Sequence, residues 1–270
     1  MRKTRRFAAL FVVATAAIAA TASAAQAWAP ADSATIRPGN QTYTEGAQCT
    51  SNFVFQDGAN VYVGQAAHCS GTGAATDTDG CDAGSLPIGT PVEIEGASNP
   101  GTLVYNSWIT MQGAGETNAD ICAYNDFALV KVDPADVAKV NPTVPFWGGP
   151  SGIATSTATG DEVVSYGNSS LRGGVRELSP KEGKSLGTTG NGWSHTVYTI
   201  TPGIPGDSGS GFMDAQGRAF GTLSTVAIAP LAASNGVGDV SREIAYMHSH
   251  GGPAANLVNG TEPFTGTLLP

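Results

Sequence analysis

Short apolar runs that end in Gly, Asn, Asp or Pro fill most of the chain, and Gly alone contributes 36 residues. Strands joined by tight turns have this composition, whereas helical bundles need longer periodic segments. The pattern therefore predicts an all-β protein. The expected strands are residues 49–56, 60–69, 90–96, 101–111, 126–132, 161–167, 195–201, 209–214 and 218–229.

A Pro- and Gly-rich stretch at residues 132–152 divides these strands into two groups. We expect two small antiparallel barrels or sandwiches, one at about 36–140 and the other at about 150–240. Residues 239–270 are expected to form a helix and a tail, with the helix in the segment DVSREIAYMHSH (239–250). The whole of this is predicted to be one domain.

The N-terminus has the pattern of a signal peptide. A positively charged start, MRKTRR, precedes an alanine-rich apolar stretch and small residues that permit cleavage after Ala27 or Ala24. A membrane anchor is the alternative, but the apolar run is too short for one. We therefore expect residues 1–27 to be removed and residues 28–270 to be secreted and extracellular. No membrane contact is expected after removal, and residues 28–45 are expected to be irregular.

The charge balance restricts the possible partners. The chain has a formal net charge of −9, and loss of residues 1–27 removes four basic residues and no acidic one, which leaves −13. A strongly acidic surface repels phosphate backbones. We therefore expect no nucleic-acid partner.

Four cysteines predict two disulfides, because an exported chain with an even number of cysteines normally oxidises them in pairs. A zinc site is the alternative, but no CxxC pair is present. Three pairings are possible. If the runs on either side of the DGAN turn form a hairpin, Cys49 and Cys69 lie close enough to bond, and Cys81 and Cys122 pair by elimination.

The segment GDSGSG at residues 206–211 could hold a nucleophile at Ser208. Taken alone, such a string is more often a plain turn. A serine hydroxyl needs a base that accepts its proton, a carboxylate that orients the base, and N–H groups for the developing oxyanion. Flanking glycines permit positive φ angles, which would direct the N–H groups of Gly206 and Ser208 to one side.

Two residues are candidates for the partners of this serine. His68 ends the apolar run QAAHC, and Asp126 directly precedes the apolar run FALV. Taken alone, His68 is more simply explained as a buried histidine, and Asp126 as a turn aspartate. Asp120 is a competing carboxylate, but no apolar strand follows it. The remaining histidines, which have no comparable setting, are His195, His248 and His250.

Together, AAHC (66–69), DFALV (126–130) and GDSGSG (206–211) resemble the chymotrypsin-like (trypsin-fold) serine peptidases, in particular the small secreted bacterial members. The order His, Asp, Ser is that of the family. A cysteine, Cys49, precedes the histidine as in the family's histidine-loop disulfide. Further similar segments are GTLS (221–224) and NGVGDV (235–240), so the resemblance covers roughly residues 36–250.

The resemblance implies two antiparallel six-stranded β-barrels with a C-terminal helix and a secreted serine endopeptidase activity. His68 would act as base and then acid, Asp126 would orient it, Ser208 would attack the carbonyl, and the N–H groups of Gly206 and Ser208 would form the oxyanion hole. Ser224 would lie beside the aspartate. Such an enzyme acts on protein or peptide substrates as a monomer, without a cofactor or metal.

The specificity pocket and the motif aspartate are less closely matched. The resemblance places Pro202 and Gly203 at the floor of the pocket. An uncharged floor argues against substrates with Arg or Lys, and Val226 would shorten the pocket. Asp207 is expected to be buried and to need a cation or several hydrogen-bond donors; a new N-terminus, Arg172 and Arg176 are the candidate cations. The other residues that the resemblance assigns to substrate binding are Ser224, Thr225 and Gly236.

Two other functions compete with that of an endopeptidase. A non-catalytic secreted protein of the same fold, which binds a protein ligand, is the main alternative, because a fold does not dictate function. An α/β-hydrolase esterase is excluded, because its serine precedes its histidine along the chain and its strands alternate with helices.

Overall fold

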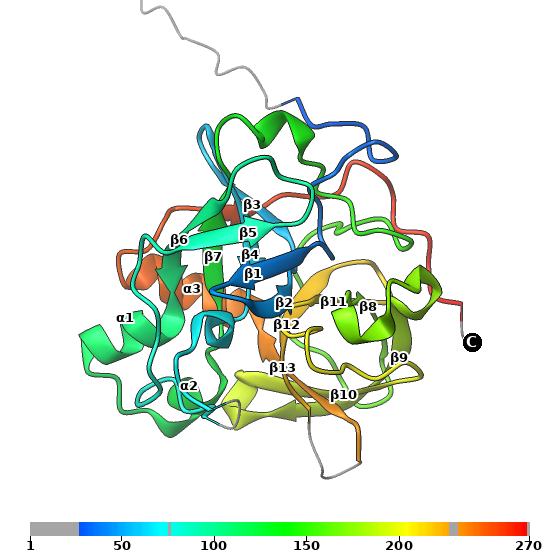
Figure 1. Cartoon of the computed structure of the whole chain (residues 1–270). Coiled ribbons are helices and arrows are strands. Elements are labelled where there is room, and N and C mark those ends of the chain that lie inside the picture. The colour runs from blue at the N-terminus through cyan, green and yellow to red at the C-terminus, as the bar shows by residue number, and fades with distance from the viewer. Residues whose placement is uncertain (1–26, 75–76, 227–231, 269–270) are drawn as a thin grey trace, which may run out of the picture.

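The computed structural model describes residues 27–74, 77–226 and 232–268, except for the side chain of Val226. Residues 1–26, which carry most of the predicted signal peptide, lie outside the described residues. The described strands form two β-units side by side, with the earlier part of the chain mainly in one unit and the later part in the other (Figure 1).

The first unit is an antiparallel sheet of eight strands in the order β14-β3-β4-β7-β6-β5-β1-β2. Its hairpin β3–β4 turns at the DGAN segment, as the sequence predicts, with Asp57 opposite Asn60. The strand bounds are β1 Gln41–Thr44, β2 Ala47–Thr50, β3 Val54–Asp57, β4 Asn60–Gln65, β5 Pro91–Ile94, β6 Gly101–Asn106, β7 Ala128–Lys131 and β14 Asn256–Leu257.

This sheet is open, which corrects the expectation of a closed six-stranded first barrel. A strand has two edges, and β3 pairs with β4 on one side and with β14, from the C-terminal tail, on the other. β2 directly precedes β3 along the chain and, within the described residues, pairs only with β1, so β14 and β2 stand at the two ends of the strand order. The expected irregular segment 28–45 contributes β1 to the sheet.

The second unit is a closed antiparallel barrel of six strands, as expected, in the order β10-β13-β12-β11-β8-β9. Sequence analysis did not assign β9, because its sequence PKEGKSLGTT has no apolar alternation. The bounds are β8 Glu162–Tyr166, β9 Pro180–Thr189, β10 Ser194–Thr199, β11 Gly211–Asp214, β12 Ala219–Val226 and β13 Asn235–Asp239.

Three α-helices accompany the strands in the described residues: α1 Ser107–Ala114, α2 Ala119–Tyr124 and α3 Val240–Ser249. The predicted C-terminal helix is confirmed as α3. The predicted strand 101–111 is wrong in its second half, because the Asn106 side chain accepts hydrogen bonds from the N–H groups of Trp108 and Ile109 and starts α1. None of these helices has the length and hydrophobicity that a membrane span requires.

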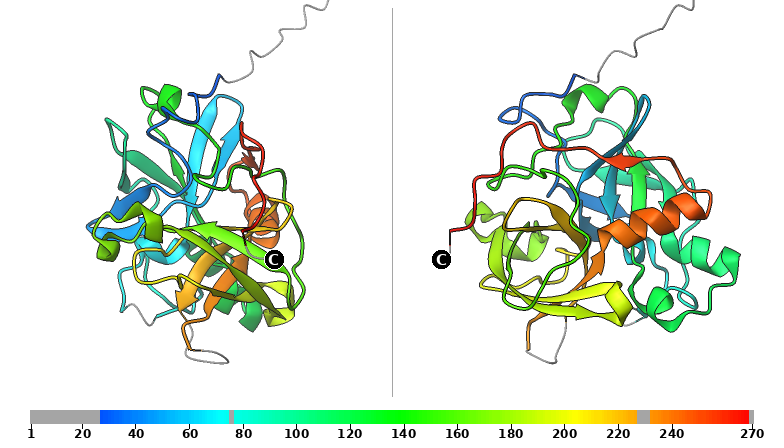
Figure 2. Two further views of the ribbon diagram at one scale, coloured as in Figure 1. Left: turned by 90° about the vertical axis from the view of Figure 1, so that its right-hand side faces the viewer. Right: turned by 180° about the vertical axis from the view of Figure 1, so that it is seen from behind.

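The two units share one apolar core, and the tail ties them together. Phe53 and Phe127 of the first unit and Met213 of the second belong to the same buried cluster, which α3 also joins through Ile244 and Met247. Seen from behind, α3 lies across the junction, and the tail runs from β14 toward the barrel (Figure 2). The shared core and α3 therefore fix the orientation of the two units relative to each other.

Candidate active site

His68 is placed by a disulfide. It lies in a 3-10 turn, Ala67–Ser70, that follows β4. The next residue, Cys69, is bonded to Cys49 in β2, and Cys81 is bonded to Cys122, so both predicted pairings are confirmed. The first bond joins β2 to the histidine turn, although β2 and β4 are not neighbours in the sheet. It therefore restricts the movement of His68 relative to the sheet edge.

Asp126 is held by backbone contacts on both sides. The hydroxyl of Ser107, the first residue of α1, donates to the carbonyl of Asn125 at 2.7 Å and accepts from the N–H of Phe127 at 3.0 Å. One carboxylate oxygen of Asp126 accepts the backbone N–H of His68 at 2.9 Å. These contacts keep the carboxylate buried and directed at the histidine.

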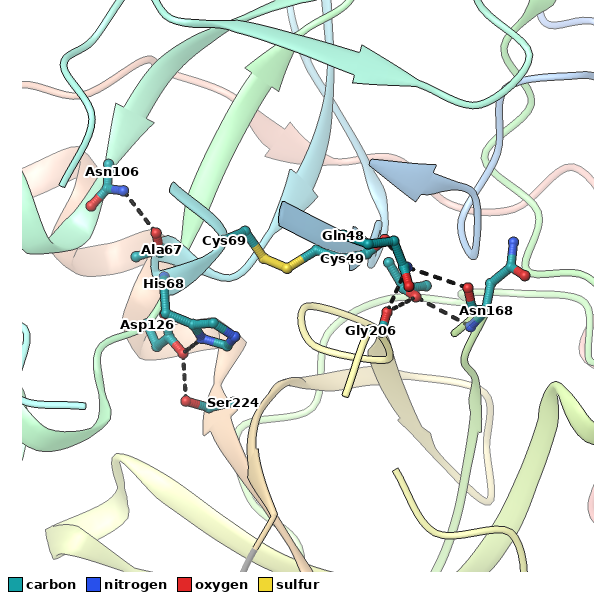
Figure 3. Close-up of a disulfide and its surroundings, with 11 residues drawn as sticks. Gln48, Cys49, Ala67, His68, Cys69, Asn106, Asp126, Asn168, Gly206 and Ser224 are labelled. Carbon is teal, nitrogen blue, oxygen red and sulfur yellow. Dashed lines mark hydrogen bonds and ion pairs between the residues drawn. A yellow bond between two sulfur atoms is a disulfide. The ribbon is translucent and has the colours of Figure 1, made fainter. Parts of the chain in front are cut away.

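The His68 ring and the Asp126 carboxylate form a short ion-pair contact. Nδ1 of His68 lies 2.7 Å from Oδ2 of Asp126, and the hydroxyl of Ser224 donates to the same oxygen at 2.5 Å. In Figure 3 the side chains of Asp126 and Ser224 lie on the opposite side of the His68 ring from Gly206. The second ring nitrogen, Nε2, has no partner among the described residues, which leaves it free to exchange a proton in the cleft.

The pKa values of this pair are shifted in opposite directions. Burial of the His68 ring disfavours its charged form, but the Asp126 carboxylate outweighs burial, and the pKa of His68 is raised above its ordinary value. Burial also raises the pKa of Asp126, but His68 and the hydroxyl of Ser224 outweigh it and lower this pKa. The carboxylate therefore stays ionised and favours the imidazole tautomer that carries its proton on Nδ1.

The Ser208 loop rests on the open edge of β2. The N–H of Thr50 donates to the carbonyl of Ser208 at 2.8 Å, and the Thr50 hydroxyl donates to the carbonyl of Gly206 at 2.7 Å. The amide of Gln48 donates to the Gly206 carbonyl at 2.9 Å. Because β2 is unpaired on this side, its backbone is free to hold the loop.

The N–H groups of Gly206 and Ser208 are unpaired within the described part of the chain, and so is the hydroxyl of Ser208. Gly206 has a φ of +94°, and a Cβ there would contact the end of the Gln48 side chain. The backbone conformation therefore favours glycine at this position. An electronegative atom beside the two N–H groups would find two donors without a competing acceptor.

A cleft of about 580 Å³ joins these groups. Both His68 and Ser208 line it. Of the residues predicted to bind substrate, Ser224 and Thr225 line the cleft, whereas Pro202, Gly203 and Gly236 are not among its described lining residues. The predicted contact through the side chain of Val226 lies outside the described residues.

Asp207 is fully buried and has two cationic partners. Its Oδ2 lies 2.5 Å from Nη2 of Arg172 and 2.9 Å from Nζ of Lys181, whose side chain is also fully buried. Oδ1 accepts the N–H of Ser169 at 3.0 Å. Arg172 is one of the cations expected from the sequence, whereas Lys181 is not, because the polar sequence of β9 does not indicate burial. These contacts hold Asp207 in place, and with it the neighbouring residues Gly206 and Ser208.

A second carboxyl group lies behind Asp126. Oε1 of Glu243, in α3, is 3.4 Å from the backbone N of Asp126, and Oε2 accepts the hydroxyl of Thr222 at 3.0 Å. Burial and the neighbouring Asp126 raise the pKa of Glu243 well above its ordinary value. Glu243 is not among the residues predicted from the sequence, although the helical spacing of Val240, Glu243 and Met247 places it on the apolar face.

His195 has a buried carboxylate partner, contrary to the interpretation that only His68 has such a setting. Its Nε2 lies 2.9 Å from Oδ2 of Asp239, and its Nδ1 lies 3.1 Å from the hydroxyl of Thr188. The His195 ring is fully buried and does not line the cleft, so the pair of His195 and Asp239 belongs to the interior of the barrel and not to the active site. The competing carboxylate Asp120 is hydrogen-bonded to Asn191 and lies away from the site.

Two clusters of side chains in the described residues are compact enough to hold a metal ion: Cys49, His68 and Cys69, and Asp79, Cys81 and Cys122. In both, the two cysteines are bonded to each other. A disulfide sulfur is not a thiolate ligand. Neither cluster therefore provides the donor set of a metal centre.

No family model matches the chain, and no curated protein matches it in sequence. Its fold matches solved structures, in each case over 83% of this chain. For Thermobifida fusca Protease A the TM-score is 0.54 at 16% identity, with 99% of that chain covered. For a serine protease described as glutamic acid specific, with a histidine triad in substrate binding, these values are 0.52, 17% and 100%. For Cellulomonas bogoriensis chymotrypsin they are 0.50, 16% and 98%. The structural neighbours are small bacterial chymotrypsin-like serine proteases, and the likeness concerns the fold.

Proposed function

We propose that the chain is a serine endopeptidase, secreted after removal of residues 1–27, that cleaves peptide bonds through an acyl-enzyme on Ser208. The observation that carries this proposal is the common cleft of Ser208 and the His68–Asp126 pair. The two disulfides support an oxidising, extracellular location. One peptidase domain over residues 28–270, acting as a monomer, remains part of the proposal.

The reaction would follow from the chemistry of these groups. The Ser208 oxygen attacks the substrate carbonyl carbon, and its proton passes to Nε2 of His68. Asp126 stabilises the resulting imidazolium, and the N–H groups of Gly206 and Ser208 bind the oxyanion. The intermediate then collapses, and His68 gives its proton to the departing amine. Water hydrolyses the acyl-enzyme by the same steps, with His68 again as base, and restores the Ser208 hydroxyl.

A fluorophosphonate probe tests this proposal, because the probe reacts with a serine that a base and an oxyanion hole activate. We expect labelling of the purified, disulfide-bonded protein at Ser208, located by mass spectrometry of the labelled peptide. Ser208→Ala and His68→Ala should abolish labelling. Ser210→Ala is the matched control, because this serine lies in the same motif but is buried.

Two results would count against an endopeptidase. Absence of labelling in a folded sample would favour the alternative, a secreted binding protein of the same fold. Labelling that persists in Ser208→Ala would place the nucleophile elsewhere. Casein digestion by the wild type, absent in Ser208→Ala, would extend the result from a reactive serine to peptide-bond cleavage.

A further inference from the structure

The position of Ser208 determines where a substrate side chain must lie. A carbonyl attacked by Ser208, with its oxygen toward the N–H of Gly206, brings the residue that carries this carbonyl, P1, next to two walls of the cleft. One wall contains Ile204 and Pro205, and the other contains Ser224 and Thr225. The depth of the space between these walls decides which P1 side chains are accepted.

The side chain of Asn235, the first residue of β13, joins the backbones behind these walls. Its Oδ1 accepts the N–H of Gly203 at 2.8 Å, and its Nδ2 lies 3.3 Å from the carbonyl oxygen of Thr225. Asn235 is fully buried, so it does not offer its amide to the cleft. An amide that spans the two segments occupies the space into which a long P1 side chain would extend.

Described side chains also fill the space beside the two glycines that the resemblance assigns to the pocket, Gly203 and Gly236. A Cβ built on Gly203 would lie 2.6 Å from Cδ1 of Leu223 and 2.8 Å from Nδ2 of Asn235. A Cβ built on Gly236 would lie 2.4 Å from the hydroxyl oxygen of Thr225. Among the described residues, the Cβ side of each glycine is therefore already filled, and neither glycine lines the cleft, although the resemblance assigned both to the pocket.

We propose that Asn235 closes the specificity pocket and that the enzyme cleaves after Gly, Ala or Ser, and not after residues with long side chains. This inference rests on the proposed function. The closed pocket means that binding must come from other subsites, and the cleft extends past His68 to Ala83 and Trp108. Substrates should therefore be peptides of several residues.

The test uses tetrapeptide p-nitroanilides that differ only at P1, which is Gly, Ala, Leu, Phe, Lys or Glu. We expect kcat/KM for Ala to exceed that for Leu and Phe by on the order of 100-fold, the discrimination that steric fit in an apolar pocket can reach. Asn235→Ala should raise the ratio of kcat/KM for Leu to kcat/KM for Ala by roughly tenfold. Ser234→Ala, a neighbouring buried position, should leave the profile unchanged.

The outcomes separate the two proposals when fluorophosphonate labelling is measured on the same samples. A wild type that does not label overturns the proposed function, and this inference with it. A wild type that labels and prefers Leu, Phe, Lys or Glu overturns the inference alone. If Asn235→Ala does not fold, the wild-type profile still decides. If it folds and labels with an unchanged profile, Asn235 is not the closing residue.

Discussion

The ammonium group of Lys181 lies 2.9 Å from the carboxylate of Asp207, and both side chains are fully buried. Arg172 contacts the same oxygen, so two cations share one anion beneath the Ser208 loop. Burial lowers the pKa of Lys181 more than the attraction of Asp207 raises it. Burying the ammonium group of Lys181 therefore costs desolvation free energy. With Arg172 as the sole cation beside Asp207, this cost would be absent.

Lys181→Met should leave the free energy of unfolding unchanged or raise it, because Arg172 still neutralises Asp207 and one buried charge disappears. Asp207→Asn should lower it by about 3–5 kcal/mol, because both cations then lose their partner. Guanidinium unfolding followed by tryptophan fluorescence measures both values. A loss in Lys181→Met as large as that in Asp207→Asn would contradict this view of the charges.

The rate of acylation should depend on the pKa of His68, because only the neutral imidazole accepts the serine proton. This pKa is raised above the ordinary value of 6.5. The acidic limb of the kcat/KM profile should therefore have its midpoint above pH 6.5, with activity rising as the pH increases through it. Asp126→Asn should move the midpoint downward and lower kcat. A wild-type midpoint below 6.5 would be inconsistent with the geometry of the pair.

Glu243 should make the protein less stable as the pH rises. Its pKa in the folded protein is well above the ordinary value of 4.5, so the folded state binds a proton that the unfolded state has released. Stability from this group is complete below pH 4.5 and declines until the pH exceeds the folded pKa. Because Gln resembles the protonated acid, Glu243→Gln should fold and remove this decline. Urea unfolding of the wild type and of Glu243→Gln at pH 5 and at pH 8 measures this decline. If the free energy of unfolding falls by the same amount between the two pH values in both proteins, the prediction is wrong.

The two disulfides should contribute differently to activity. They separate their cysteines by 20 and 41 residues, which corresponds to about 3 and about 4 kcal/mol in the loop-entropy account. Only the first joins the histidine turn to β2. The double variant Cys49→Ala/Cys69→Ala should therefore label with fluorophosphonate more slowly than the wild type, and by more than the unfolded fraction of the variant explains. Cys81→Ala/Cys122→Ala, the matched control, should lose stability and label at close to the wild-type rate.

Local patterns in the sequence were sufficient for several features. The DGAN turn predicted the β3–β4 hairpin, the segment DVSREIAYMHSH predicted α3, and the four cysteines together with the hairpin predicted both disulfides. Asp126 was placed inward because an apolar strand follows it directly, and it is buried. For the turn, the helix and Asp126, the deciding residues lie next to one another or at a fixed period, so one segment contains the whole signal. The disulfide pairing follows from the hairpin, which brings the distant Cys49 and Cys69 together.

Only the tertiary structure decided the features that depend on distant partners. Residues 256–257 of the tail add a strand beside β3 in the first sheet, and no local pattern at β3 predicts this. A buried Lys181, a buried pair of His195 and Asp239, and an Asn235 that spans two pocket walls are equally hidden in the sequence. A polar group is stable inside a protein only when its partners compensate for lost water, and here those partners come from remote strands and loops.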